Sequence, residues 1–297
     1  MSEPFHQEVL DAVDAAGLAS SLDDRAAVAL AASYYRNRDT GQTAGQYGQG
    51  WEVLAEVAPP GGYNGIAMRH AASRTLVVIN RGTEGLSSID DWLQNIKASV
   101  LHVPGPQMDP AMQLLGDGFD MARGLGVDQI LICGHSLGGA LADVQGALVK
   151  SFIAGRGHTC PPVRVVGVAS AGFAAAARRY AADRNLTPDP AAQGYIIHYI
   201  RGEDLVPTYS GRGIFGVDQK IASAYEARNV QRHGPRPGWE WRRVADPLLQ
   251  HQRSLYYQFF GESTARHIWF SRKGDTFTVR NGSTPAWREG LQRPDDW

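Results

Sequence analysis

The sequence DQILICGHSLGGALADVQGAL, residues 128–148, decides the fold of this chain. Its apolar run at 130–133 indicates a buried strand, and the small apolar residues from Ala140 onward indicate a closely packed helix. Between them, Gly134 and Gly138 frame Ser136 in a Gly-x-Ser-x-Gly turn. A strand, a sharp turn and a helix in this order form a nucleophile elbow. Such an elbow lifts a serine hydroxyl clear of the backbone and points the positive end of the helix at it.

The Gly-x-Ser-x-Gly string alone is weak evidence in a chain with 34 glycines. The alternative interpretation is a surface turn with an ordinary serine. A surface turn does not need the second glycine pair, Gly138 and Gly139, or an apolar strand before it. A larger side chain at Gly134 or Gly138 would collide across so tight a turn. We therefore interpret Ser136 as a nucleophile.

The composition favours one α/β domain over the whole chain, residues 1–297. With 29 basic and 30 acidic residues the net charge is -1, so no strong field favours a nucleic acid and we expect no such partner. No apolar run approaches the roughly 20 residues that span a bilayer. The N-terminus lacks the basic start and apolar core of a signal peptide. The expected location is therefore the cytoplasm, with export by a signal-independent route left open. Cys133 and Cys160 are expected to be free thiols.

Apolar segments on both sides of the elbow predict the other core strands. Residues 51–57, 63–70 and 75–80 predict three strands before it, and residues 163–169 and 195–200 predict two after it. Alternation of such strands with helical segments favours right-handed crossovers and a mostly parallel sheet with helices on both faces.

Four segments lie outside this pattern. Residues 7–36 predict two short N-terminal helices, and residues 112–125 a helix that leads into the elbow strand. Residues 208–247 have a looser pattern, typical of an insertion. Residues 267–281 alternate around a turn and predict a C-terminal hairpin, added at an edge of the sheet.

Sites in parallel sheets form at the carboxyl ends of the strands. Thr83 follows the strand at 75–80, where its backbone amide and hydroxyl can face an oxygen that becomes negative during a reaction. Asp204 lies four residues beyond Ile200, at the end of another predicted strand. Residues 84–96 have apolar positions at helical spacing, which fits either an amphipathic flap over the site or an ordinary packed helix.

A serine hydroxyl needs a base within hydrogen-bond reach and a carboxylate that orients the base. Asp204 is the favoured acid because apolar residues follow it and can anchor its loop; Glu203 is the reserve. A loop carboxylate that only caps a turn is the alternative interpretation of Asp204. His251 is the favoured base because it begins a helical segment. His267 lies in the first strand of the predicted hairpin, and His233 lies in a stretch rich in glycine and proline.

With these residues in place, the chain resembles the class 3 (fungal-type) lipase family of α/β hydrolases. The resemblance covers roughly residues 50–260, in family order and spacing. It is carried by five motifs: VVINRGTEG at 77–85, DDWLQNI at 90–96, GDGF at 116–119, GHSLGGALA at 134–142 and EDLVP at 203–207.

The resemblance implies an α/β-hydrolase fold with a triad of Ser136, Asp204 and His251. It also implies an oxyanion hole formed by the Thr83 and Leu137 amides, and a lid near residues 84–96. No metal ion or organic cofactor is implied.

Three residues depart from the family pattern, and they bear on the substrate more than on the mechanism. Asn80 replaces an aromatic residue that is common before the Arg-Gly-Thr motif. Asp117 stands where a histidine is frequent, and Arg201 stands where an asparagine is usual.

The implied function is a serine carboxylic ester hydrolase, similar to lipases or phospholipases A1, that acts on lipid or acyl esters through an acyl-enzyme. A transient contact with a membrane surface is compatible with this function. Two other hypotheses stay open: a catalytically silent binding module of the same fold, and a secreted antibacterial effector of lipase type. The effector would pair with an immunity protein, a partner that no residue supports. Acyl chain length and head-group preference do not follow from the sequence.

Overall fold

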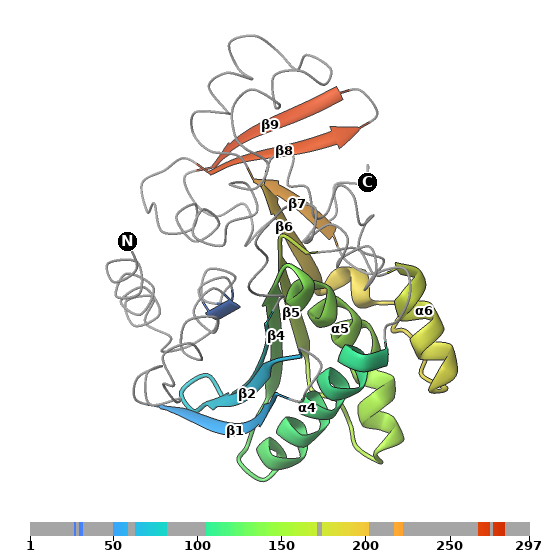
Figure 1. Ribbon diagram of the computed structural model, residues 1–297. Helices are drawn as coiled ribbons and strands as arrows, with labels where there is room; N and C mark the ends of the chain where they lie inside the picture. Colours follow the sequence, from blue (N-terminus) through green and yellow to red (C-terminus); the bar gives the residue numbers. More distant parts are fainter. Residues whose placement is uncertain are drawn as a thin grey trace.

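The structure of the chain, a computed structural model, describes residues 27, 30, 31, 50–58, 63–81, 105–170, 174–201, 217–221, 267–273 and 276–282 (Figure 1). Within these residues nine strands form one sheet, and they follow one another across the sheet as they do along the chain. The strands are β1 Trp51–Val57, β2 Gly65–His70, β3 Thr75–Asn80, β4 Gln129–His135, β5 Val163–Val168, β6 Ile196–Arg201, β7 Val217–Ile221, β8 His267–Lys273 and β9 Thr276–Gly282. The helical elements are α4 Gly105–Arg123, α5 Leu137–Gly155, α6 Ala174–Asp183 and the short 3-10 helix η2 Ala192–Gly194.

The centre of the sheet is parallel. β3 pairs in parallel with β4, and parallel pairing continues through β5 and β6 to β7. The pairs at both ends, β1 with β2, β2 with β3, β7 with β8 and β8 with β9, are antiparallel. Among the described strands, β2 and β8 therefore run against the other seven. The prediction of a mostly parallel sheet is confirmed.

One face of the sheet packs against α4, α5 and α6, which lie on the same side in Figure 1. Alternate residues of the central strands point to this side and are fully buried there, as in a strand with a period of two. Leu76 and Val78 of β3 and Ile132 of β4 are examples. α5 is almost wholly apolar on every side, so it lies in the interior of the protein.

The opposite face of the sheet is buried as well. Val77 and Ile79 of β3 and Leu131 of β4 alternate with the residues that contact the helices, and they are equally inaccessible to solvent. Such continuous burial is typical of strands covered on both faces. Leu30 and Ala31 are helical and buried as well. They belong to the segment 7–36, whose other residues, Ala27 apart, lie outside the described part of the chain.

Most predicted strands appear at their predicted positions. β3 occupies 75–80 and β1 occupies 51–57, as expected, and β2, β4, β5 and β6 agree to within two residues. The helix predicted for 112–125 begins seven residues earlier, because Pro110 sits inside α4 rather than before it. Pro110 is the sixth residue of α4, so it donates no N–H to the helical carbonyl four residues earlier.

The regions outside the core are described in part. Two antiparallel strands, β8 and β9, lie where the C-terminal hairpin is predicted, and β9 forms the edge of the sheet. The segment 208–247, predicted as an insertion, contains β7, a parallel member of the sheet that the sequence pattern did not indicate. The rest of this segment lies outside the described residues.

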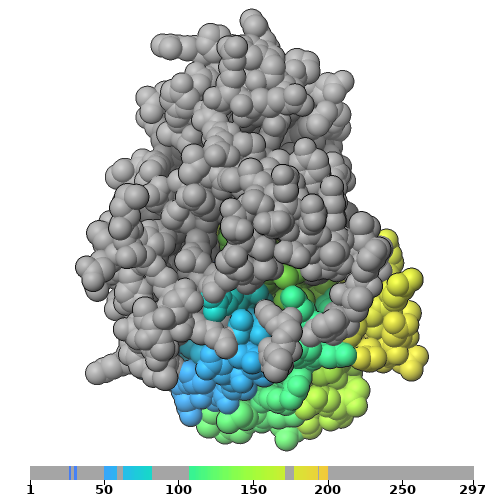
Figure 2. All heavy atoms as spheres, viewed as in Figure 1, coloured from blue at the N-terminus to red at the C-terminus, as the bar shows by residue number. Residues whose placement is uncertain are grey.

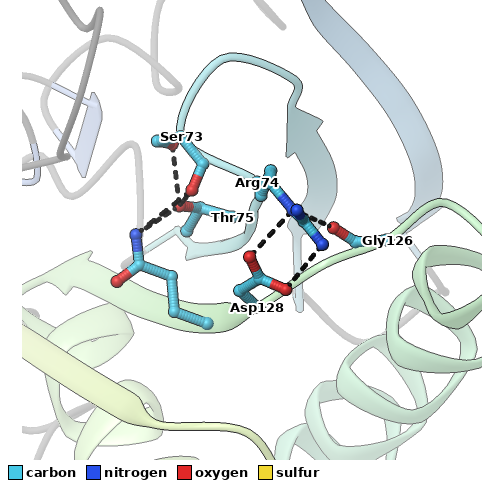
Figure 3. A network of polar contacts seen from close by, with 6 residues as sticks. Ser73, Arg74, Thr75, Gly126 and Asp128 are labelled. Atoms are coloured by element: carbon cyan, nitrogen blue, oxygen red, sulfur yellow. Dashed lines mark hydrogen bonds and ion pairs between the residues drawn. The ribbon is translucent and has the colours of Figure 1, made fainter.

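The amino ends of β3 and β4 are fastened together by side chains (Figure 3). The Arg74 guanidinium donates to the Gly126 carbonyl at 2.9 Å and to the Asp128 carboxylate at 2.9 Å. Beside it, the hydroxyls of Ser73 and Thr75 lie 2.7 Å apart. The Gln129 amide donates to the Thr75 hydroxyl at 2.8 Å. These contacts fix the end of the sheet that is opposite the elbow.

The surface of the described residues includes one edge of the sheet. In Figure 2, β1 and β2 lie at the surface beside α4. None of the helices in the described ranges is long and apolar enough to cross a membrane.

Both cysteines are free thiols, as predicted. Burial raises the pKa of the Cys133 thiol, and it raises that of Cys160 to about 11.

Candidate active site

Ser136 lies in the turn between β4 and α5, with backbone angles of φ 59° and ψ -124°. A positive φ is unusual for a residue with a Cβ, and it costs about 1–3 kcal/mol that the surrounding structure must offset. The Ser136 N–H donates to the Val168 carbonyl at 2.8 Å, which holds the turn to β5. The side chain makes no capping hydrogen bond to α5, although serine often caps a helix. The Ser136 hydroxyl is therefore not used by the helix that it precedes.

The glycines of the elbow are required by close approach of backbones. A Cβ at Gly134 would lie 2.3 Å from the Gly138 carbonyl oxygen, and a Cβ at Gly138 would lie 2.2 Å from the Asn80 carbonyl oxygen. Carbon atoms never approach a backbone oxygen so closely, so only glycine fits at both positions. This confirms the predicted role of the two glycines. It also shows that the backbone of the elbow is in close contact with the end of β3.

Leu137, the predicted oxyanion donor, is the first residue of α5. The N–H groups of the first helical turn have no carbonyl partner within the helix, and the helix dipole makes this end positive. The Leu137 side chain is buried in the core, which fixes the orientation of the first turn. An amide in this place, next to Ser136, can stabilise an oxygen that becomes negative.

The carboxyl ends of β3, β4 and β6 meet at the same edge of the sheet. Asn80, the last residue of β3, is the partner of Gly134 in the parallel pairing with β4. The Arg81 N–H then donates to the Asn64 carbonyl at 2.9 Å, so the chain is held as it leaves β3. β6 ends at Arg201 on the same side. This is the edge at which parallel sheets place their sites.

The structure thus brings Ser136 and Leu137 together, and it does not describe the other predicted site residues. Thr83 and Asp204 follow β3 and β6 by three residues each, outside the described part of the chain, as does the reserve acid Glu203. His251, the alternative base His233 and the predicted lid at 84–96 lie outside it too. His267, the other alternative, is the first residue of β8. Their roles stay predictions.

Two polar side chains of α5, Asp143 and Gln145, are buried beside the elbow and were not singled out from the sequence. They are two residues apart, so they project from different sides of the helix. Asp143 lies 3.4 Å from the Nε2 atom of His198 in β6, and both side chains are 2% exposed. Polar residues in a helix that is otherwise small and apolar were the signal that could have found this pair.

Gln145 belongs to a second buried group, with Tyr63 and Asn80. The Tyr63 hydroxyl donates to the Asn80 side-chain oxygen at 2.8 Å, and the Asn80 amide donates to the Gln145 oxygen at 2.6 Å. The Gln145 amide in turn donates to the Ala111 carbonyl of α4 at 2.6 Å. We call Tyr63, Asn80 and Gln145 the amide relay. It joins β2, β3, α5 and α4 directly behind the elbow.

No titratable cluster in the described residues fits a metal ion. Within 50–58, 63–81, 105–170 and 174–201, no three His, Cys, Asp or Glu side chains lie close enough to bind one.

Asp189, which precedes the strand β6, accepts hydrogen bonds from the Lys150 ammonium, the Ala191 N–H and the Tyr195 hydroxyl. Burial opposes ionisation of this carboxyl, but the three donors prevail and lower its pKa. Asp189 therefore fastens the loop before β6 to α5.

Comparison with solved structures finds lipases that are similar to this chain. The Lip2 lipase of Yarrowia lipolytica is 20% identical, with a TM-score of 0.36, and the match covers 59% of this chain and 66% of that one. Lipase II from Rhizopus niveus is 15% identical, with a TM-score of 0.42, over 67% of this chain and 78% of that one. A triacylglycerol lipase from Penicillium expansum is 16% identical, with a TM-score of 0.41, over 68% and 80%.

The chain thus spans just under two thirds of the Yarrowia lipase that it matches. The three solved structures are lipases, the class that the sequence resembles. Comparisons with protein-family models and with curated proteins find no match. The fold assignment stands on the molecule itself: a parallel central sheet, and a strained serine between β4 and α5 at the carboxyl edge. This is the α/β-hydrolase fold.

Proposed function

We propose that the chain is a serine carboxylic ester hydrolase that acts on lipid or acyl esters, similar to lipases and phospholipases A1. The observation that carries this proposal is the backbone of Ser136, which stays strained at the carboxyl edge of the sheet without capping α5. Strain of this kind persists where the surrounding structure holds a residue for a function. The three solved structures are named as lipases, and their sequence identity to this chain is low.

In the proposed mechanism, the Ser136 Oγ attacks the ester carbonyl while His251 accepts its proton and Asp204 holds the imidazole in place. The carbonyl oxygen becomes negative and is stabilised by the amides of Leu137 and Thr83. Collapse of this intermediate breaks the ester bond, and the alcohol leaves with the proton from His251. Water then attacks the acyl-enzyme by the same route, and the acid and free Ser136 are released.

Release of carboxylic acid from esters of graded chain length tests the proposal. We expect turnover by the native chain and loss of about 10³-fold or more in Ser136→Ala, because the nucleophile is removed. A fluorophosphonate should label the native chain at Ser136, as read by mass spectrometry of the peptide. Equal activity in Ser136→Ala would overturn the mechanism. An intact fold without turnover or labelling would instead favour the silent binding module.

Within this function, the preference for phospholipid or neutral lipid is a separate measurement. Vesicles of phosphatidylcholine and emulsions of triacylglycerol, offered at equal ester concentration, distinguish the two classes of substrate.

A further inference from the structure

The amide relay joins α5, the helix that begins at the elbow, to the end of β3. Tyr63 precedes β2, Asn80 ends β3, and Gln145 sits on the third turn of α5. All three side chains are 1% exposed or less. Buried polar groups cost free energy unless they are hydrogen-bonded, so a relay in the core of an otherwise apolar helix needs a reason.

The direction of each hydrogen bond in the relay is fixed. The Ala111 carbonyl can only accept, so the Gln145 nitrogen must face it and the Gln145 oxygen must face Asn80. The Asn80 nitrogen then donates to Gln145, which leaves its oxygen for the Tyr63 hydroxyl. Each amide has a single orientation. The Asn80 side chain is therefore held rigidly from two sides.

The backbone of Asn80 is held as well. Its carbonyl oxygen is the atom that a Cβ on Gly138 would strike at 2.2 Å, and Gly134 is its neighbour in β4. The segment that carries the predicted second oxyanion donor thus starts from a residue that both the elbow and the relay fix.

We propose that Asn80 and Gln145 are positioning residues for the oxyanion hole. They hold the first turn of α5, which follows Ser136 and begins with the Leu137 amide, against the end of β3. This inference rests on the proposed function. It explains why a polar Asn80 stands where the resemblance leads one to expect an aromatic side chain: an aromatic ring could not bond to Gln145. Misplacement of a catalytic group by about 1 Å typically costs about 100-fold in rate.

The test compares the same substitution, glutamine to leucine, at two residues that contact opposite ends of β3. Gln145→Leu removes the acceptor of the Asn80 amide. Gln129→Leu, the control, removes the hydrogen bond to Thr75 at the far end of the strand. Both variants are assayed well below the unfolding temperature of the less stable one. The measurements are kcat and KM on a soluble ester, and the inhibition constant of an alkyl boronic acid. The boronate adduct of Ser136 is tetrahedral and places an oxygen in the oxyanion hole.

In Gln145→Leu we expect kcat to fall about 10- to 100-fold, boronate inhibition to weaken by a similar factor and KM to change less than about threefold. Gln129→Leu should leave all three quantities within about twofold. If Gln145→Leu does not fold, Tyr63→Phe carries the test, because it removes only the donor to Asn80; the same pattern is expected at about three- to tenfold.

Two failures are distinguishable. A native chain that turns over esters, together with a Gln145→Leu variant that matches Gln129→Leu in kcat and in boronate inhibition, overturns the positioning role alone. A native chain that neither turns over esters nor reacts at Ser136 overturns the proposed function and this inference with it.

Discussion

Ser136 combines two demands on one residue, since it must present a hydroxyl and must also adopt a backbone angle that disfavours a side chain. Its φ of 59° lies where glycine is at ease and residues with a Cβ are strained. The N–H bond to Val168 and the tight contacts of Gly134 and Gly138 hold it there. The proposed function accounts for why serine is kept in this place.

The strain at Ser136 predicts that removal of its Cβ stabilises the fold. We expect Ser136→Gly to raise the free energy of unfolding by about 1 kcal/mol, since relief of about 1–3 kcal/mol of strain exceeds the entropy cost of glycine. Ser136→Ala is the matched control, because it removes the hydroxyl and keeps the Cβ. Urea unfolding compares the two variants. A Ser136→Ala variant as stable as Ser136→Gly would show that the hydroxyl, and not the backbone, is the source of the strain.

At the scale of elements, α5 is the part to which the proposed site is attached. Ser136 precedes it, Leu137 begins it, Gln145 joins it to β3, and Asp143 joins it to β6. The two strands that it contacts through polar side chains are those that lead to Thr83 and Asp204. Apolar packing leaves freedom to slide, whereas polar contacts of fixed direction do not. A displacement of α5 should therefore affect every member of the site.

The two ends of α5 should respond in opposite ways to the same substitution. Gly138→Ala would place a Cβ 2.2 Å from the Asn80 carbonyl oxygen, so the backbone must shift. We expect a loss of about 2 kcal/mol or more in stability, together with loss of activity. Gly155→Ala, at the last residue of the helix, meets no atom within 4 Å. It should stabilise the protein by about 0.5–1 kcal/mol, because alanine favours the helix.

Thermal unfolding of the two variants, with ester turnover measured on the same samples, checks this contrast. A stable and active Gly138→Ala variant would mean that the elbow does not press against β3.

For the whole molecule, the Asp189 carboxylate sets part of the response of stability to acid. Its pKa in the folded protein is lowered, so its contribution is fully present above the pKa of the unfolded chain, about 3.9. The contribution is lost as the pH falls through the folded value. We expect Asp189→Asn, which keeps the shape and the acceptor oxygen, to lower stability at pH 7.

At pH 3 the difference between Asp189→Asn and the native chain should become smaller, because the unfolded native chain takes up a proton below about 3.9 while the folded carboxylate, with its lowered pKa, takes it up only at a lower pH. Urea unfolding at the two pH values measures it. A difference that stays constant or grows on acidification would contradict the assignment of Lys150, Ala191 and Tyr195 as the donors that favour the charged form.

Sequence patterns anticipated the parallel core of the molecule because each core strand is short, apolar and bounded by turns. β3 is predicted at 75–80 and occurs there. β1 shows what such patterns miss. The alternation of Trp51, Val53, Ala55 and Val57 predicts that Val53 faces the core, but Val53 is 36% exposed and Leu54 is buried. The register shift between Val53 and Ala55 reverses the alternation, and no residue type announces such a bulge.

The residues of the candidate site also differ in whether local sequence predicts them. Ser136 and its glycines follow from local sequence, because strand, turn and helix are contiguous. Asn80 and Gln145 of the amide relay are 65 positions apart, and Asp143 and His198 are 55 positions apart (198 − 143). Only the folded sheet brings such residues together. Buried polar residues in an apolar helix indicate that partners exist, but they do not identify the partners.

The state of the two cysteines makes the chain suitable for fluorescence. Cys133 and Cys160 are its only thiols, and with their raised pKa values few of them are thiolates at neutral pH. A cysteine introduced at Met121 in α4, which is 53% exposed, would be the thiol that a maleimide dye modifies first. The dye would then report on α4, with both native thiols left in place.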